Sequence, residues 1–129
     1  MTYGEFLVRV RERASCTDRE ESERITGAVA VLLGTRLQAN SARHLAAQLP
    51  GELTAPLTRA GGGAETWTEA EFLERVREAT GAESAEAARQ QAEAVCCTVR
   101  DTVTGGELNK LISQLPSGYA PLFGHPELA

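Results

Sequence analysis

Two adjacent cysteines, Cys96 and Cys97, are the residues of this sequence whose types and spacing are most suggestive of chemistry. A vicinal dithiol can bind a soft metal or cycle through oxidation. The alternative is that both are core residues, because reduced cysteine is commonly buried and packs like a small hydrophobic residue. No Cys-x-x-Cys spacing and no nearby histidine supply further metal ligands. We therefore favour core packing for this pair.

Cys16, the third cysteine, lies just before a segment that is expected to begin a helix. The amides at a helix N-terminus stabilise a thiolate and so lower the pKa of an exposed thiol. If Cys16 is exposed, we expect it to be the most reactive of the three thiols.

The histidines, His44 and His125, do not indicate a catalytic site. A catalytic base needs a nucleophile or an orienting carboxylate held against it, and no spacing in the sequence suggests one. His44 falls on an expected helix and His125 in the C-terminal tail, so we interpret both as surface residues. An enzyme is disfavoured, and no catalytic residue is predicted.

The many carboxylates fit solvated helix faces better than a metal site. A di-iron bundle would need inward carboxylates and Glu-x-x-His pairs, and no Glu-x-x-His occurs. The glycines at 61–63 and 105–106 form neither a dinucleotide fingerprint nor a phosphate loop, so we assign them to a linker and a helix break. No metal and no cofactor are predicted. The carboxylates considered are Glu5, Glu12, Glu20, Glu21, Glu23, Glu71, Glu74, Glu78, Glu86 and Glu93.

The elements that would position these residues form a repeat, which is visible when the sequence is shifted by 66 positions. Seven of the eight residues in 5–12 then match residues 71–78, and Gln-Leu-Pro recurs at 48–50 and 114–116. No gap is needed. We call residues 66 positions apart counterparts. The counterparts of Cys16, Cys96 and Cys97 are Ala82, Ala30 and Val31, so an apolar residue suffices at each position.

Each repeat is expected to form three helices. Apolar residues recur at i, i+3 or i+4 and i+7 in each segment, which is the core-facing pattern of an amphipathic helix. Thr2 with Glu5, and Thr68 with Glu71, fit the capping box that begins a helix. Pro50 should end the third helix, because the residue before proline disfavours helical geometry. The expected spans are 3–14, 17–37 and 41–49, and then 69–80, 84–103 and 107–115.

With Glu-Phe-Leu-x-Arg-Val-Arg-Glu at both helix starts and Gln-Leu-Pro closing both units, the chain resembles the bacterial family known as domain of unknown function 2267. The Asp-Arg-Glu-Glu run at 18–21 and Gly-Gly-Glu-Leu at 105–108 add to the resemblance, which covers about residues 3–124. It implies a compact, duplicated helical fold. It implies no activity, and no site residue can be carried over from it.

Composition and charge exclude several partners. The chain has 129 residues, 42% of them hydrophobic, with 13 basic and 18 acidic side chains and a net charge of -5. An acidic chain is poorly suited to nucleic acid or to an anionic membrane surface. Neither a signal peptide nor a membrane-spanning run is expected, so we place the protein in the cytoplasm with its thiols reduced. Lys110 is the only lysine, and this arginine-rich, alanine-rich composition hints at a bacterial source.

The expected fold is all-α, with two three-helix units packed with pseudo-two-fold symmetry into one bundle domain over residues 1–129. The units are 3–58 and 68–124, joined by a Gly-rich linker at 59–67. The leading functional hypothesis is a non-enzymatic module that binds an unknown protein partner, as a monomer or homodimer. The alternative is a pocket for a small ligand or soft metal at the seam between the units, with Cys96 and Cys97 at its wall.

Overall fold

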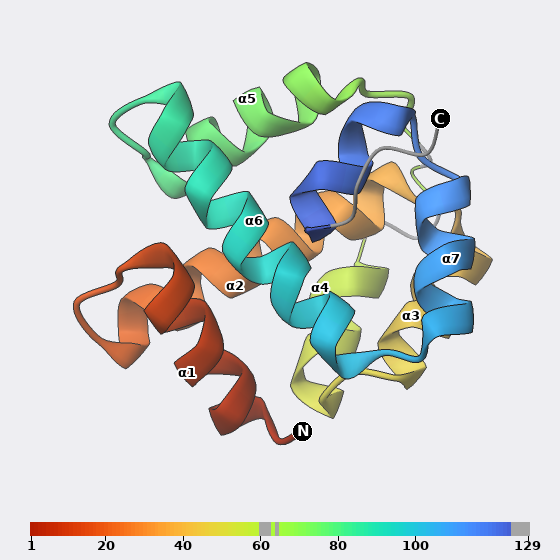
Figure 1. Cartoon of the computed structure of the whole chain (residues 1–129), viewed down its shortest axis with the longest axis horizontal. Helices are drawn as coiled ribbons and strands as arrows, with labels where there is room; N and C mark the ends of the chain where they lie inside the picture. The colour runs from red at the N-terminus through yellow and green to blue at the C-terminus, as the bar shows by residue number, and fades with distance from the viewer. Residues whose placement is uncertain (60–62, 64, 125–129) are drawn as a thin grey trace.

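The computed structural model describes residues 1–59, 63 and 65–124 of the chain (Figure 1). Within these residues every regular element is a helix, as the sequence predicts, and the helices pack into a bundle. His125 and linker residues 60–62 and 64 lie outside the described residues. The elements are α1 (Tyr3–Ala14), α2 (Arg19–Arg36), α3 (Ala39–Ala47), the 3-10 helix η1 (Gly51–Leu53), α4 (Thr54–Thr58), α5 (Glu69–Thr80), α6 (Ala85–Thr102), α7 (Gly105–Ser113) and the 3-10 helix η2 (Ser117–Phe123).

The bounds of α5, α6 and α7 are the counterparts of those of α1, α2 and α3. Local capping accounts for this. The hydroxyl of Thr2 accepts a hydrogen bond from the Glu5 amide, and Thr68 accepts one from the Glu71 amide, which completes both predicted capping boxes. The second helices begin after Asp18 and Ser84, whose side chains cap them in the same way.

The third helices begin and end two residues earlier than predicted, at 39–47 and 105–113. Gly105 and Gly106 form the first turn of α7, because the hydroxyl of Thr104 caps that turn by accepting from the Glu107 amide at 3.2 Å. The interpretation of these glycines as a helix break was therefore wrong. At the other end, the chain tightens before Pro50, where the Gln48 amide bonds to the Leu45 carbonyl.

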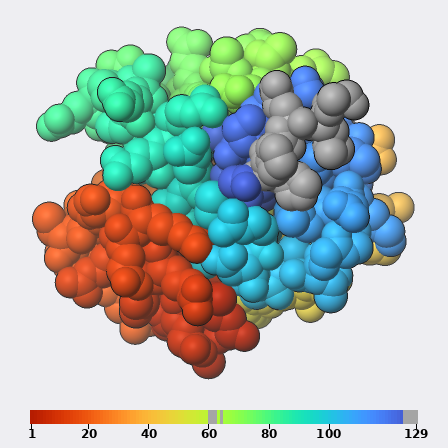
Figure 2. Space-filling model, viewed as in Figure 1, coloured from red at the N-terminus to blue at the C-terminus, as the bar shows by residue number. Residues whose placement is uncertain are grey.

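The helices of the two halves are interleaved. α6 crosses the middle of the bundle, in contact with α1 on one side and α5 on the other (Figure 1). α5 also contacts α2, so the first helix of each half packs on the second helix of the other half. The surfaces of α1 and α6 adjoin without a gap on the face shown in Figure 2. α3 and α7 lie side by side at the end of the bundle.

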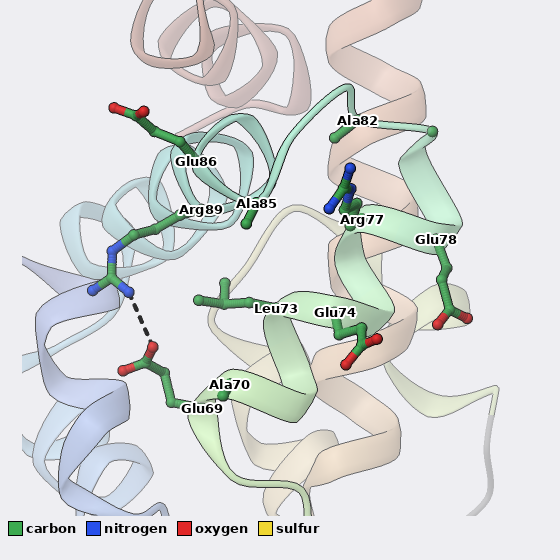
Figure 3. A pocket seen from close by; sticks show the side chains of 11 residues that line it. Glu69, Ala70, Leu73, Glu74, Arg77, Glu78, Ala82, Ala85, Glu86 and Arg89 are labelled. Carbon is green, nitrogen blue, oxygen red and sulfur yellow. Dashed lines mark hydrogen bonds and ion pairs between the residues drawn. The ribbon is translucent and has the colours of Figure 1, made fainter.

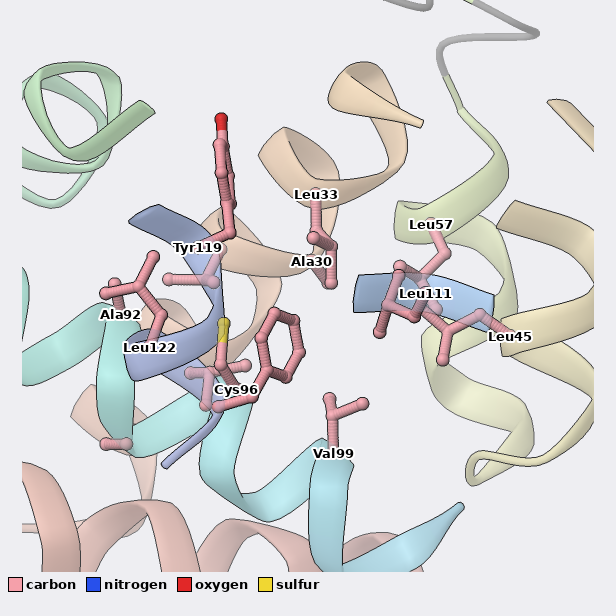
Figure 4. Close-up of a cluster of buried hydrophobic side chains, with 14 of the residues drawn as sticks. Ala30, Leu33, Leu45, Leu57, Ala92, Cys96, Val99, Leu111, Tyr119 and Leu122 are labelled. Carbon is pink, nitrogen blue, oxygen red and sulfur yellow. The ribbon is translucent and has the colours of Figure 1, made fainter. Parts of the chain in front are cut away.

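A single apolar cluster runs through both halves. Phe6 and its counterpart Phe72 are both fully buried, and the Phe72 ring lies 5.4 Å from that of Tyr119 in a tilted arrangement. Figure 4 shows the part of this cluster where residues of α2 and α6 meet Tyr119 and Leu122 of η2. No helix of the described residues is long and apolar enough to cross a membrane.

Candidate functional site

A groove of about 860 Å³ runs between α5 and α6. Its walls come only from the first two helices of the second half and the turn between them (Figure 3). It therefore differs in place from the pocket that the sequence suggested at the seam between the halves. The lining residues are Glu69, Ala70, Leu73, Glu74, Arg77, Glu78, Gly81, Ala82, Ala85, Glu86 and Arg89.

The floor of the groove is apolar. Leu73 points from α5 into the space between the two helices, and Ala70, Ala82 and Ala85 lie around it (Figure 3). Leu73 is only half-buried, whereas its counterpart Leu7 is 2% exposed. The second half thus leaves Leu73 partly uncovered, whereas the first half encloses the counterpart Leu7.

The two arginines of the groove are already engaged. Arg89 bonds to a carboxylate oxygen of Glu69 at 3.0 Å, the contact drawn in Figure 3, and pairs with Glu93 at 3.3 Å. Arg77 donates a hydrogen bond to the Glu83 carbonyl at 3.1 Å. Arg89 is therefore paired with carboxylates, whereas Arg77 bonds to a neutral carbonyl and keeps its positive charge in the groove.

The glutamates on the rim are largely unpaired. Glu74 and Glu86 are exposed and take part in no ion pair within the part of the chain that the structure describes. Glu78 has only a 3.9 Å approach to Arg75, both side chains being at least half exposed. Four glutamates and two arginines line the groove, so its formal charge is -2. The available charge on its rim is negative.

The counterpart position between α1 and α2 holds a hollow of only about 100 Å³, which is lined by Gly4, Leu7, Val8, Arg11 and Arg19. Its lining contains two arginines and no carboxylate. Arg19 stands where the groove has Ala85, and Val8 stands where it has Glu74. Larger side chains, Arg19 in place of Ala85 among them, thus accompany the smaller hollow of the first half.

Cys96 lies inside the core and does not line the groove. Its side chain is 1% exposed and sits among Ala92, Val99, Tyr119 and Leu122 (Figure 4). Burial raises the pKa of this thiol well above its usual range, and the neighbouring Cys97 adds to the effect. A buried, protonated thiol of this kind is a poor nucleophile and a poor metal ligand.

Cys97 is half-buried, and its thiol donates a long hydrogen bond of 3.5 Å to the Leu122 carbonyl. Burial raises its pKa, although the guanidinium groups of Arg100 and Arg13 act in the opposite direction. Cys97 is the most accessible of the three thiols.

Cys16 is buried, with 9% of the residue exposed. Burial raises the pKa of its thiol, and the carboxylate of Glu21 raises it further. Cys16 was expected to be the most reactive thiol only if it were exposed, and in the structure it is buried.

His44 is exposed and lines a hollow of about 530 Å³ between α3 and α7, together with Arg43, Glu107 and Lys110. A second hollow of about 450 Å³ is lined by Arg36, Leu37, Gln38, Ser41 and Gln114. Residues of both halves line each of the two hollows. Neither Cys96 nor Cys97 lines either of them.

The carboxylates lie on solvated faces. None of the ten glutamates considered above is buried. Within residues 1–59, 63 and 65–124, no group of three or more His, Cys, Asp or Glu side chains could hold a metal ion. Two pairs at helical spacing form, between Arg75 and Glu78 and between Arg89 and Glu93.

Sequence reasoning missed the groove. Leu73 belongs to the repeated motif at 71–78 but was expected only to face the core, and Ala85 and Arg89 lie in an expected helix and belong to no motif. The signal that could have found them is the difference between counterparts, because Ala85 replaces Arg19 and Glu74 replaces Val8.

Fold and groove together define an all-helical bundle with an apolar groove that has an acidic rim, and the described residues hold no group of side chains that could form a metal centre. Residues 3–122 match the family described as "Uncharacterized conserved protein (DUF2267)". The chain belongs to this family, as its repeated motifs suggested. No curated protein matches it.

Proposed function

We propose that this chain is a non-enzymatic protein-interaction module whose binding surface is the groove between α5 and α6. The observation that carries the proposal is Leu73, a half-buried leucine on the floor of a groove of about 860 Å³. An apolar surface rimmed by polar groups commonly marks a contact site, and helical grooves accept segments of partner proteins.

A protein segment suits the groove better than a small molecule. Pockets for small ligands are usually enclosed and direct a few convergent polar groups at the ligand. Here Ala70 and Ala85 are exposed, so the groove is open to solvent, and its carboxylates stand along the rim. We place the small-ligand or soft-metal alternative second, because the hollows between α3 and α7 lack thiols and Cys96 is enclosed by the core.

We also infer that residues 3–58 and 68–124 are duplicated units related by a pseudo-two-fold axis within one domain. The equal helix bounds at an offset of 66 and the reciprocal packing of α1 on α6 and α5 on α2 support this. Of the two equivalent helix pairs, α5 and α6 leave a groove of about 860 Å³, whereas α1 and α2 leave a hollow of about 100 Å³. Overlaying 3–58 on 68–124 tests the relation, and a rotation far from 180° would contradict it.

Co-purification tests this function, because recovery of the partner protein should depend on Leu73. Leu73→Arg should abolish recovery of a stoichiometric protein partner from the native host, because it fills the floor of the groove with charge. Val8→Arg changes an apolar residue that is already 54% exposed on α1 and serves as the matched control. Equal recovery by wild type, Leu73→Arg and Val8→Arg proteins would exclude the groove as the binding surface.

A further inference from the structure

We propose that the partner segment is a basic amphipathic helix, with apolar side chains against Leu73 and arginine or lysine side chains beside Glu74, Glu78 and Glu86. This inference rests on the proposed function, because it names the partner of the same groove.

The dimensions of the groove set the length of this helix. Its lining runs from Glu69 to Gly81, which is the whole of the 12-residue α5 and its C-cap. At 1.5 Å per residue, α5 is about 18 Å long, which accommodates about three turns of a partner helix. Apolar residues at i, i+3 or i+4 and i+7 of that helix would lie along the strip formed by Ala70, Leu73 and Ala85.

Backbone hydrogen bonding favours a helix over an extended segment. A common way to bind an extended peptide is to add it to the edge of a sheet, and the described residues contain no strand to receive it. The groove is walled by two helices whose interior backbone groups are already paired. A partner helix satisfies its own backbone and needs only side-chain contacts.

The charges make the partner basic. Four glutamates and two arginines line the groove, and Arg89 is already paired with Glu69 and Glu93, so carboxylates remain in excess on the rim. An acidic partner would meet unbalanced like charge here, which is costly at an interface. The counterpart hollow, with Arg11 and Arg19, has the opposite charge and little volume.

Three labelled helical peptides test the proposal by fluorescence anisotropy. All share one leucine stripe and carry lysine, glutamine or glutamate at the other positions. The lysine peptide should bind wild-type protein about tenfold more tightly than the glutamine peptide, and the glutamate peptide more weakly still. The preference should fall as salt is raised, because the carboxylates are solvent-exposed.

A pair of matched double variants distinguishes binding at the groove from a general effect of the protein's net charge. The double variant with Glu78→Lys and Glu86→Lys should bind the lysine peptide about tenfold or more weakly than the wild-type protein does. Their counterparts are Glu12 and Glu20, which occupy the same helix positions in α1 and α2 and are also exposed. Glu12→Lys with Glu20→Lys changes the net charge equally and should leave affinity within about threefold.

Circular dichroism should show that both double variants fold. The neutral pair Glu78→Gln with Glu86→Gln keeps the side-chain size and should give an intermediate loss. The proposal is overturned if the lysine peptide binds no better than the glutamine peptide, or if both double lysine variants weaken it equally. It is also overturned if the protein forms a dimer in sedimentation that Leu73→Arg dissociates, because a second copy would then occupy the groove.

The two proposals fail in different ways. If the glutamine peptide binds as tightly as the lysine peptide and Leu73→Arg abolishes both, the groove remains the binding surface and only the basic partner is excluded. If Leu73→Arg leaves the binding of every peptide unchanged, the groove itself is excluded.

Discussion

Gly34 lies where α2 passes closest to α4. A Cβ atom at this position would be 2.0 Å from the Leu57 carbonyl oxygen, which is a backbone atom that a side-chain rotation cannot move. The absence of a side chain therefore allows the two helices to pack. Its counterpart, Arg100, instead donates a hydrogen bond to the Phe123 carbonyl at 3.2 Å.

Gly34→Ala should lower the free energy of unfolding by about 2–4 kcal/mol, because the helices must separate to admit the methyl group. At Gly27, on the same helix, a Cβ atom would have no neighbouring atom within 4 Å. Gly27→Ala should therefore raise stability by up to about 1 kcal/mol through helix propensity. Urea denaturation measures both, and equal effects of the two substitutions would refute the close approach.

Asp101 ties α6 to α1. Its carboxylate bonds to Arg13 at 2.5 Å and to Arg100 at 3.1 Å. Partial burial raises the pKa of Asp101, but the hydrogen bonds from Arg13 and Arg100 outweigh it and hold the pKa below its usual value. Since the folded pKa is lower than the unfolded one, the stabilisation is present above the unfolded pKa and is lost as pH falls through the folded pKa.

Asp101→Asn should therefore lower the melting temperature at pH 6, at a cost of up to about 1 kcal/mol for this partly exposed pair. The difference from wild type should shrink as pH falls below about 4, the usual unfolded pKa of aspartate. Thermal melts of both proteins between pH 6 and pH 3 measure this. A difference that stays constant with pH would show that the charge is not responsible.

The three thiols differ in accessibility rather than in intrinsic chemistry. Titration of the native protein with a thiol reagent should modify Cys97 slowly and leave Cys96 and Cys16 unmodified, because the latter two are buried. All three should react in denaturant. Rapid modification of Cys16 or Cys96 in the native protein would instead show that its region opens readily.

At the scale of elements, two glutamines join the third helices of the two halves. The Gln48 side chain accepts a hydrogen bond from the Thr104 amide, at the start of α7, at 2.8 Å. Gln114 accepts one from the Ser41 hydroxyl, in the first turn of α3. Gln48 thus ties the end of α3 to the backbone at the start of α7. Gln114 reaches the other half through the Ser41 side chain, and its own side-chain NH2 group donates a hydrogen bond to the Lys110 carbonyl of α7 at 3.2 Å.

Gln48→Ala should lower the free energy of unfolding by about 1 kcal/mol, because the Thr104 amide loses its partner. Gln114→Ala should also lower the melting temperature, because the Ser41 hydroxyl loses its bond to the other half. Gln38, whose side chain makes no capping bond to α3, provides the control. If the Gln38→Ala and Gln48→Ala proteins have the same melting temperature, the hydrogen bond between Gln48 and Thr104 does not stabilise the fold.

For the whole molecule, the exchange of contacts between halves should make unfolding cooperative. α1 packs on α6 and α5 on α2, so neither half keeps its core when the other unfolds. Trp67, the single tryptophan, reports on the junction, where its carbonyl accepts hydrogen bonds from Arg36 and Tyr119, both at 2.8 Å.

Tryptophan fluorescence and far-ultraviolet circular dichroism should therefore give the same urea midpoint. Coincident transitions indicate one cooperative unit, because the first probe is local and the second reports all helices. Separate midpoints would show that 3–58 and 68–124 are independent domains.

The sequence by itself determined the helices and most of their ends. Thr2, Thr68, Asp18 and Ser84 cap helices through contacts within three residues, so the information is local. The third helix of the second half was misplaced by two residues because Gly105 and Gly106 disfavour a helix, whereas the Thr104 cap and the contact of α7 with α3 hold both glycines in the first turn of α7. In the first half no side-chain cap marks the start of α3 at Ala39, so no local signal placed it.

Tertiary structure decided which surfaces remain open. The apolar stripes of α1 and α5 are alike in sequence, yet Leu7 is enclosed and Leu73 lines a groove. That difference depends on what the neighbouring helix presents, Arg19 in one half and Ala85 in the other. Helix formation follows from neighbours along the chain, whereas a groove follows from residues that only packing brings together, and so the binding surface had to be found in three dimensions.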